Sequence, residues 1–214
     1  MSDIFDLFKK ISPKEPATPH APPTHILVGL GNPGDKYTLT RHNAGFLALG
    51  YISEKLNVKV NRLKYRALTG EAEIAGVRVM LLAPQTYMNL SGEAVRECAD
   101  FYKIAPSNII VISDDINLDV GRLRVRRSGS DGGQKGLRSI IEQLGTDEFP
   151  RIRIGVGAAP HPEYEIPDWV LSEFSKEEQK IIFESMATVY AGVEKILAGD
   201  VDGAMQLCNG KSNR

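Results

Sequence analysis

Apolar positions follow two patterns along the chain, and these two patterns alternate. Residues 25–30 form a short apolar run, which predicts a strand, whereas residues 43–56 repeat apolar side chains on one helical face. By the same patterns, further strands are expected at 67–74, 77–83, 108–113, 122–126 and 151–156, and further helices at 91–102, 133–144 and 175–199. The alternation predicts an α/β fold with a single domain, in which a mixed, twisted β-sheet is flanked by helices on both faces in three layers.

Short polar signals mark turns and helix ends. Ala75-Gly76 separates two predicted strands in the manner of a hairpin. Ser91 is placed to cap the helix that follows it. Ser175 and Glu178 have the spacing of a capping box, and we expect them to open a long final helix that ends at Gly199.

The first 24 residues differ in composition from the rest of the chain. Five prolines lie between Ser12 and Pro23, with no apolar period, which is typical of a linker. We therefore divide the chain into an N-terminal extension with a proline-rich linker (1–24), one domain (25–210) and a short tail (211–214). A domain of this length can bury a full hydrophobic core.

Charge and cysteine content narrow the range of partners. The 214 residues carry a formal net charge of −1, so any binding of nucleic acid needs a local basic patch. No apolar run reaches membrane-spanning length, and the N-terminus lacks the apolar core of a signal peptide. Cys98 and Cys208 have no metal or redox spacing, which fits a reducing compartment. We expect a cytoplasmic protein and a monomer, with no membrane contact, no metal and no cofactor.

One histidine and one strand-terminal carboxylate are the leading candidates for catalysis. His42 lies in a polar cluster where a loop meets a predicted helix, and an imidazole is a competent general base near neutral pH. Asp114 ends a buried strand, where α/β sheets face their ligand crevice, and could orient an imidazole. Asp115 would point to the opposite face if the strand continued. The amide of Asn89 could hold a carbonyl or an oxyanion.

Structural explanations for the same residues remain open. A single histidine is commonly a surface or a structural residue. Asp114 or Asp115 could simply cap a turn, and Asn89 could mark a helix start.

The first glycine-rich segment also fits a different class of protein. Residues 29–34 read Gly-Leu-Gly-Asn-Pro-Gly, which has the spacing of a dinucleotide-binding motif. That motif requires its last glycine to open a helix, but residues 35–41 show no helical period. A strand followed by a tight turn and an irregular loop is the better interpretation.

A basic segment at residues 122–138 indicates a contact with an anion. Residues 122–126 alternate, which places two apolar residues on one strand face and three arginines, Arg122, Arg124 and Arg126, on the other. A glycine-rich loop and a helix start follow near Gly133. Arginines beside a helix N-terminus are typical of a phosphate site, although a solvated strand face is the simpler alternative. Crowded positive charge in a chain of net −1 favours a polyanion.

Together, four segments resemble the bacterial-type peptidyl-tRNA hydrolase family. They are Gly-Leu-Gly-Asn-Pro-Gly, Thr-Arg-His-Asn-Ala-Gly, Met-Asn-Leu-Ser-Gly and Gly-Gly-x-x-Gly-Leu, in the order and approximate spacing of the family, between about His25 and Asn209. The resemblance implies a hydrolase for the ester that joins a peptide to the 3′ ribose of tRNA, which recycles tRNA from prematurely released peptidyl-tRNA. It therefore implies tRNA as the partner.

The resemblance also implies roles for individual residues. His42 would deprotonate water, Asp114 would hold and polarise His42, and Asn89 would position the water or the oxyanion. The substrate contacts that it implies are Asn32 at the peptide, Tyr37 and Tyr87 near the terminal nucleotide, Lys135 at a substrate-binding position, and Arg126 and Arg153 as a clamp on the tRNA 5′-phosphate.

The chain departs from the family pattern at one place. Where the family usually has His-Asn, this chain has Gln134-Lys135. Gln134 keeps a donor and an acceptor but cannot titrate, whereas Lys135 loses the acceptor and adds a charge. This pair mildly favours a rival function, a non-catalytic RNA-binding protein on the same scaffold. The enzyme is favoured by His42, Asp114, Asn89 and Asn32, and a turnover assay with peptidyl-tRNA separates the two functions.

Overall fold

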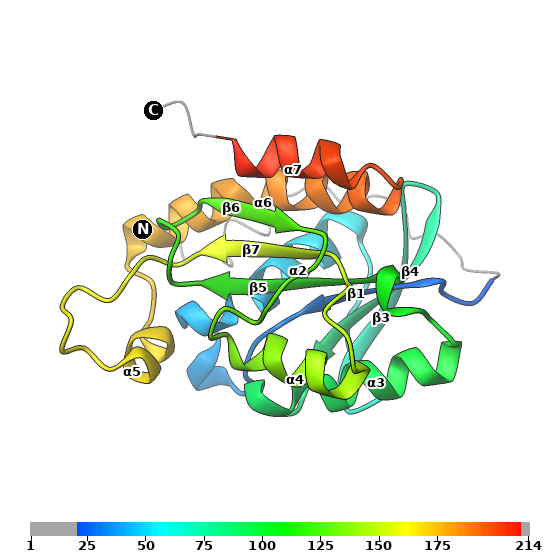
Figure 1. Cartoon of the computed structure of the whole chain (residues 1–214), viewed down its shortest axis with the longest axis horizontal. Helices are drawn as coiled ribbons and strands as arrows, with labels where there is room; N and C mark the ends of the chain where they lie inside the picture. The colour runs from blue at the N-terminus through cyan, green and yellow to red at the C-terminus, as the bar shows by residue number, and fades with distance from the viewer. Residues whose placement is uncertain (1–20, 211–214) are drawn as a thin grey trace.

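The computed structural model describes residues 21–210, so most of the predicted N-terminal extension and the predicted tail lie outside it. Within these residues the strands form a seven-stranded sheet in the order β2-β3-β4-β1-β5-β7-β6 (Figure 1). The strands are β1 (His25–Gly29), β2 (Arg62–Lys64), β3 (Ala67–Ile74), β4 (Val77–Pro84), β5 (Ile109–Asp115), β6 (Leu123–Arg126) and β7 (Arg151–Gly155). The central strands β4, β1, β5 and β7 are parallel, and β2, β3 and β6 pair antiparallel at the two edges.

Helices cover both faces of this sheet, as predicted. The α-helices are α2 (Ala44–Leu56), α3 (Ser91–Tyr102), α4 (Lys135–Leu144), α5 (Ile166–Leu171), α6 (Lys176–Leu197) and α7 (Val201–Asn209). Residues 21–210 also contain four 3₁₀ turns, namely η1 (Asp35–Tyr37), η2 (Arg41–Asn43), η3 (Met88–Leu90) and η4 (Pro106–Asn108).

Strand alternation creates two separate hydrophobic cores. In β5, Ile110 and Ile112 face the core that α2, α6 and α7 cover, whereas Ile109 and Val111 face the core under α3 and α4. Both cores contain fully buried aliphatic side chains, whose removal from water is the main stabilising contribution to the fold. The single-domain, three-layer α/β prediction is therefore confirmed.

Helix ends show where local signals succeeded and failed. Ser175 and Glu178 form the predicted capping box at the start of α6. The predicted cap at Ser91 is wrong, because Ser91 is already the first residue of α3 and its hydroxyl donates to the Met88 carbonyl. Helix α4 begins at Lys135, two residues later than predicted, because the Gln134 side chain caps it.

Three short elements were not predicted. They are β2, α5 and α7, so α6 is not the last helix. Helix α7 packs on the edge strand β6, where the Asn209 side chain bonds both backbone groups of Val125. Each missed element is short: β2 pairs with the adjacent strand β3, whereas α7 is held by contacts with residues far away in the sequence. No helix in residues 21–210 is long and apolar enough to cross a membrane.

The glycines of the first segment serve packing. A Cβ on Gly29 would come within 2.4 Å of the Gly45 carbonyl oxygen, and a Cβ on Gly45 would come within 2.4 Å of the Ile112 carbonyl oxygen. Helix α2 can therefore approach the ends of β1 and β5 closely. Between Gly34 and α2 the chain forms η1, a loop and η2, and not a helix that opens at the last glycine. This arrangement supports the loop interpretation over the dinucleotide-binding one.

Candidate active site

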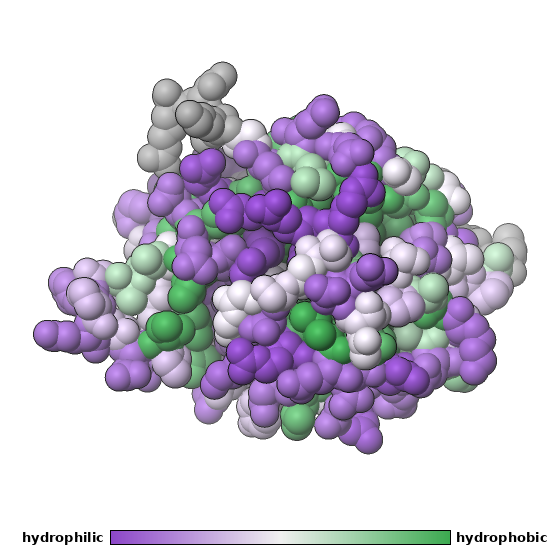
Figure 2. Space-filling model, viewed as in Figure 1, coloured by the Kyte–Doolittle hydropathy of each residue, from purple (hydrophilic) through white to green (hydrophobic). Residues whose placement is uncertain are grey.

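A pocket of about 630 Å³ opens at the carboxyl ends of the central strands. Segments that follow β1 and β4 contribute Asn32 and residues 87–89, and the end of β5 contributes Asp114 and Asp115. The opposite wall is apolar and consists of residues from α5, of which Ile166 and Leu171 are exposed. Hydrophobic residues gather beside α5 on the otherwise mainly hydrophilic face in Figure 2. The site thus combines hydrogen-bonding groups with one apolar wall.

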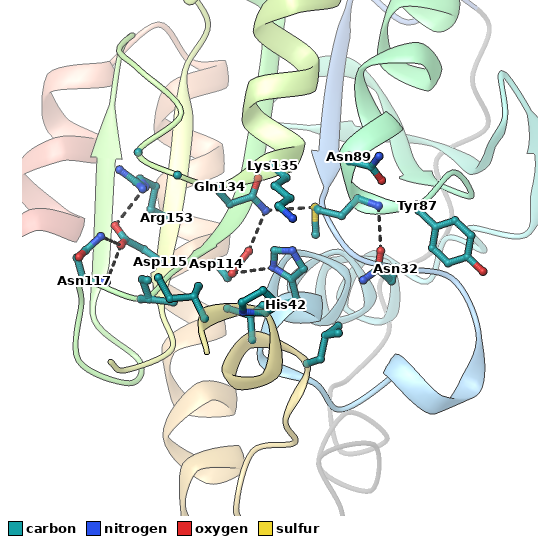
Figure 3. A pocket seen from close by; sticks show the side chains of 18 residues that line it. Asn32, His42, Tyr87, Asn89, Asp114, Asp115, Asn117, Gln134, Lys135 and Arg153 are labelled. Atoms are coloured by element: carbon teal, nitrogen blue, oxygen red, sulfur yellow. Dashed lines mark hydrogen bonds and ion pairs between the residues drawn. The ribbon is translucent and has the colours of Figure 1, made fainter. Parts of the chain in front are cut away.

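His42 and Asp114 meet in this pocket although they are 72 positions apart. His42 Nδ1 lies 2.9 Å from Asp114 Oδ2, and the two side chains are 11% and 3% exposed. A carboxylate accepts hydrogen bonds, so this contact places the imidazole proton on Nδ1 and leaves the lone pair of Nε2 available. The structure therefore brings together the predicted base and its predicted carboxylate (Figure 3).

The second oxygen of Asp114 also has a partner. Gln134 Nε2 donates to Asp114 Oδ1 at 2.9 Å, while Gln134 Oε1 accepts from the backbone N–H of Leu137 at 2.7 Å. Gln134 is only 6% exposed. Sequence reasoning noted Gln134 as a departure from a family pattern but did not connect it with Asp114.

A second group of amides shapes the side of the pocket near β1. Asn43 accepts from the backbone N–H of Asn32 at 2.9 Å and donates to the Asn32 carbonyl at 3.0 Å. Asn32 Oδ1 in turn accepts from the backbone N–H of Met88 at 2.9 Å. These bonds tie the loop after β1 to η3. They use the backbone groups and the side-chain oxygen of Asn32, so its side-chain Nδ2 can donate to a ligand. No local pattern in the sequence signals the contact between Asn43 and Asn32.

Asp115 points to the opposite face of the sheet from Asp114, as the strand period predicts. Its Oδ1 accepts from Asn117, and its Oδ2 lies 3.1 Å from Arg153 Nε. The Arg153 contact lacks hydrogen-bond geometry and is therefore electrostatic. The terminal nitrogens of Arg153 lie beside Gly132, where a Cβ would come within 2.6 Å of Nη2. Arg153 thus reaches the pocket wall from β7.

Strand register gathers four arginines on one face. Arg124 pairs with Arg153 across β6 and β7, and Arg126 pairs with Arg151. Arg126 is exposed, whereas Arg151 is 1% exposed and donates to the carbonyls of residues 129, 147 and 149. Burial lowers the pKa of Arg151 to about 10, with the nearby Arg153 charge acting in the same direction and Asp147 opposing it. Arg151 is therefore structural. The predicted pair, Arg126 and Arg153, occupies diagonal positions on neighbouring strands of this face, because Arg126 is opposite Arg151 and Arg153 is opposite Arg124.

Arg41, the neighbour of His42, holds η2 against α5 and α6. Its guanidinium pairs with both carboxylate oxygens of Glu178 at 2.9 Å and donates to the Val156 carbonyl at 3.0 Å. It also stacks on Trp169, 3.7 Å from the ring centroid. Burial alone would raise the pKa of Glu178, but the hydrogen bonds and charge of Arg41 outweigh it and the pKa is lowered. Sequence reasoning missed this contact because Glu178 is 137 positions away.

The remaining predicted site residues divide into two groups. Tyr87, Asn89 and Lys135 line the pocket, and all three are exposed. In Figure 3, Tyr87 and Asn89 lie near Asn32 on one side of His42, and Asp115 and Arg153 lie on the other. Tyr37 and Arg126 do not line it, and the Tyr37 ring lies 4.8 Å from Lys36 Nζ.

These features define the class of protein. It is a three-layer α/β protein whose pocket holds a His–Asp pair of the kind that activates water in hydrolases. Among the described residues that line this pocket there is no serine, threonine or cysteine that could act as a covalent nucleophile.

Comparison with known proteins then identifies the family. The family model for peptidyl-tRNA hydrolase matches residues 26–214, and the chain belongs to the peptidyl-tRNA hydrolase family. The chain is 50% identical over 186 residues to the peptidyl-tRNA hydrolase of Caldicellulosiruptor bescii, a match that covers 87% of this chain and 97% of that protein. It is 52% identical over 190 residues to the peptidyl-tRNA hydrolase of Clostridium botulinum (strain Eklund 17B / Type B), with coverage of 88% and 98%.

A solved structure supports the same assignment. The crystal structure of peptidyl-tRNA hydrolase from Acinetobacter baumannii superposes with a TM-score of 0.81 at 34% sequence identity. The superposition covers 89% of this chain and 97% of that chain. The likeness therefore extends over most of both chains.

Proposed function

We propose that this protein hydrolyses the ester bond between the peptide and the tRNA of peptidyl-tRNA, with His42 as the general base. The observation that carries the proposal is the 2.9 Å contact between His42 Nδ1 and Asp114 Oδ2, two residues that line the pocket. Membership of the family and the identity of about half of the residues to curated relatives support the substrate class. The cellular role would be the recycling of tRNA from prematurely released peptidyl-tRNA.

The proposed reaction has two steps. His42 Nε2 removes a proton from a water molecule while the water oxygen attacks the ester carbonyl carbon, and the negative charge moves to the carbonyl oxygen. The tetrahedral intermediate then collapses, the bond to the 3′ ribose oxygen breaks, and the imidazolium returns its proton to that oxygen. Asp114 stabilises the imidazolium between the two steps. Asn89 is the proposed donor to the water or the oxyanion.

The rest of the pocket is assigned to the substrate. Asn32 is the proposed contact with the peptide, because its side chain is fixed by Met88 and it lines the pocket. Tyr87 offers an exposed ring for the terminal nucleotide, and Lys135 offers a cation near its phosphates. The proposed contact at Tyr37 has no support from the pocket lining. Arg126 and Arg153 are the proposed clamp for the tRNA 5′-phosphate.

The test is turnover of peptidyl-tRNA by the wild-type protein and by His42→Ala. We expect the variant to lose nearly all turnover while it keeps its folding and its affinity for tRNA, because a base contributes to the transition state and not to the core. A His42→Ala variant with a rate comparable to wild type would refute the assignment of the base. A wild-type protein that binds tRNA without turnover would instead establish the non-catalytic RNA-binding function.

A further inference from the structure

Gln134 connects the start of a helix with the catalytic pair. Its side-chain oxygen accepts from the Leu137 N–H at 2.7 Å, which satisfies one of the free backbone donors in the first turn of α4. Its side-chain nitrogen donates to Asp114 Oδ1 at 2.9 Å. One amide therefore performs two tasks, a helix cap on one end and a donor to the carboxylate on the other.

The orientation of this amide is fixed by both neighbours. A backbone N–H can only donate, so the atom that faces Leu137 must be the oxygen. An ionised carboxylate can only accept, so the atom that faces Asp114 must be the nitrogen. The two requirements agree, and a flipped amide would lose both hydrogen bonds.

Packing around Gln134 leaves the side chain little freedom. The residue is 6% exposed, and its Nε2 also lies 3.2 Å from Met88 Sδ. Gly136 lies close by, and a Cβ at that position would come within 2.6 Å of Met88 Sδ and 3.1 Å of Gln134 Oε1. A side chain at residue 136 would therefore require Met88 and Leu30 to shift.

We propose that Gln134 is a positioning residue that holds the Asp114 carboxylate in the plane that orients His42. Asp114 has two oxygens, and each one accepts a single bond of 2.9 Å, from His42 and from Gln134. With Oδ1 held, the carboxylate cannot rotate away from the imidazole, so Nε2 stays directed at the pocket. The inference rests on the proposed role of His42 as the base, and Gln134 is proposed to act on it through Asp114.

The decisive variant is Gln134→Glu, which separates the two tasks. The glutamate keeps an oxygen for Leu137, so the helix cap and the fold should persist, but it presents an oxygen where Asp114 needs a donor. We expect kcat on peptidyl-tRNA to fall by about tenfold or more, with KM unchanged within about twofold. The matched control is Gln143→Glu, which adds the same charge to an exposed position of the same helix. Its kcat should stay within about twofold of wild type.

The effect of Gln134→Glu on kcat should reverse when Asp114 is replaced by asparagine. In Asp114→Asn, the asparagine NH₂ and the Gln134 NH₂ would face each other as two donors. Adding Gln134→Glu there restores a donor–acceptor pair in the reverse sense, and leaves the asparagine oxygen for His42. We therefore expect Gln134→Glu to raise kcat in the Asp114→Asn background although it lowers kcat in the wild type. A purely structural role at the helix cap cannot change sign in this way.

The outcomes are distinguishable from those that test the proposed function. Wild type and His42→Ala are measured in the same assay, so an inactive wild type or an active His42→Ala counts against the base and not against Gln134. If Gln134→Glu fails to fold, Gln134→Met serves instead, since methionine cannot donate to Asp114 and should also lower kcat at unchanged KM. The proposal is overturned if the folded variant keeps the wild-type kcat. Equal loss of kcat from Gln134→Glu in both backgrounds also overturns it.

Discussion

Asp114 and Asp115 are consecutive residues at the end of β5, yet their side chains leave the strand toward opposite faces of the sheet. Asp114 contacts the imidazole of His42 and the amide of Gln134. Asp115 contacts Asn117 and the permanent cation of Arg153. Both carboxylates are 3% exposed, so burial does not distinguish them.

The difference lies in what each carboxylate can exchange with its partner. The partner of Asp114 is an imidazole, which can take a proton from water and return it to a leaving group, so this pair is suited to catalysis. The partner of Asp115 is a guanidinium, which has no lone pair to act as a base, so that pair is suited to holding a cation in place. Because consecutive side chains of a strand point to opposite faces, one aspartate lies beside the proposed catalytic base and the other beside the proposed phosphate-binding arginine.

Among the variants that compare the two aspartates and their partners, the largest effect is expected from Asp114→Asn. The substitution keeps the shape of the side chain but removes the charge that stabilises imidazolium, and it allows an unproductive tautomer of His42. We expect kcat to fall by roughly a thousandfold, about 4 kcal/mol in barrier, with little change in KM. Steady-state hydrolysis of peptidyl-tRNA measures both. If kcat is unchanged and only KM rises, Asp114 contributes to substrate binding, as proposed for Asp115, and not to the chemical step.

The variants Arg153→Ala and Arg126→Ala test the proposed phosphate clamp, which lies on the same side of the sheet as Asp115. Each should raise KM for full-length peptidyl-tRNA by about tenfold and reduce the salt dependence of binding, because one phosphate contact is lost. A short substrate without the 5′-phosphate end should be affected little. The comparison of the two substrates is the control, and equal losses on both would rule out a phosphate clamp.

The double variant Gln134→His with Lys135→Asn examines the partners of Asp114. A histidine can still donate to the Asp114 carboxylate, so we expect kcat to change by less than about tenfold, below about 1.4 kcal/mol. The loss of Lys135 should slightly reduce salt sensitivity. Steady-state rates at two salt concentrations test both statements. A gain of roughly a hundredfold or more would mean that the natural pair disables the site, and would favour a non-catalytic RNA-binding protein.

The smallest effect is expected from Glu178→Gln, a carboxylate outside both pairs. Its pKa is lowered in the folded protein, so its contribution to stability is complete above the ordinary glutamate value of 4.5 and disappears as the pH falls through the lowered pKa. Glutamine preserves the capping box. Wild type should therefore be more stable than the variant at pH 7, and the difference should shrink below about pH 4.5. Urea unfolding between pH 3 and pH 7 measures it. A pH-independent difference would mean that the Glu178 charge does not stabilise the fold.

The sequence predicted the elements with a strong period and missed one strand and two α-helices that are short. Strand β5 was recognised because its apolar run is continuous, and its end correctly indicated that Asp114 and Asp115 diverge. Strand β2 and helices α5 and α7 are short, and their positions depend on tertiary packing. Ser91 failed as a cap because 3₁₀ turn η3 precedes α3 directly and uses the Ser91 hydroxyl as a donor.

The candidate site shows the same division. His42 and Asp114 could be paired from residue type and position, supported by the family resemblance, and the structure brings them together. The bond from Gln134 to Asp114 and the ion pair between Arg41 and Glu178 join residues 20 and 137 positions apart. No periodicity connects such residues, because their contact is created only when the loops close over the end of the sheet.

The most direct test of the division between the two aspartates is single-turnover hydrolysis by Asp114→Asn and Asp115→Asn with the enzyme in excess. Asp114→Asn should lower the rate at saturating enzyme by roughly a thousandfold and leave the half-saturating concentration within about threefold of wild type. Asp115→Asn should keep the saturated rate within about threefold and raise the half-saturating concentration, because Arg153 loses its anchor. Similar losses of the saturated rate in both variants would contradict the assignment of one aspartate to chemistry and the other to binding.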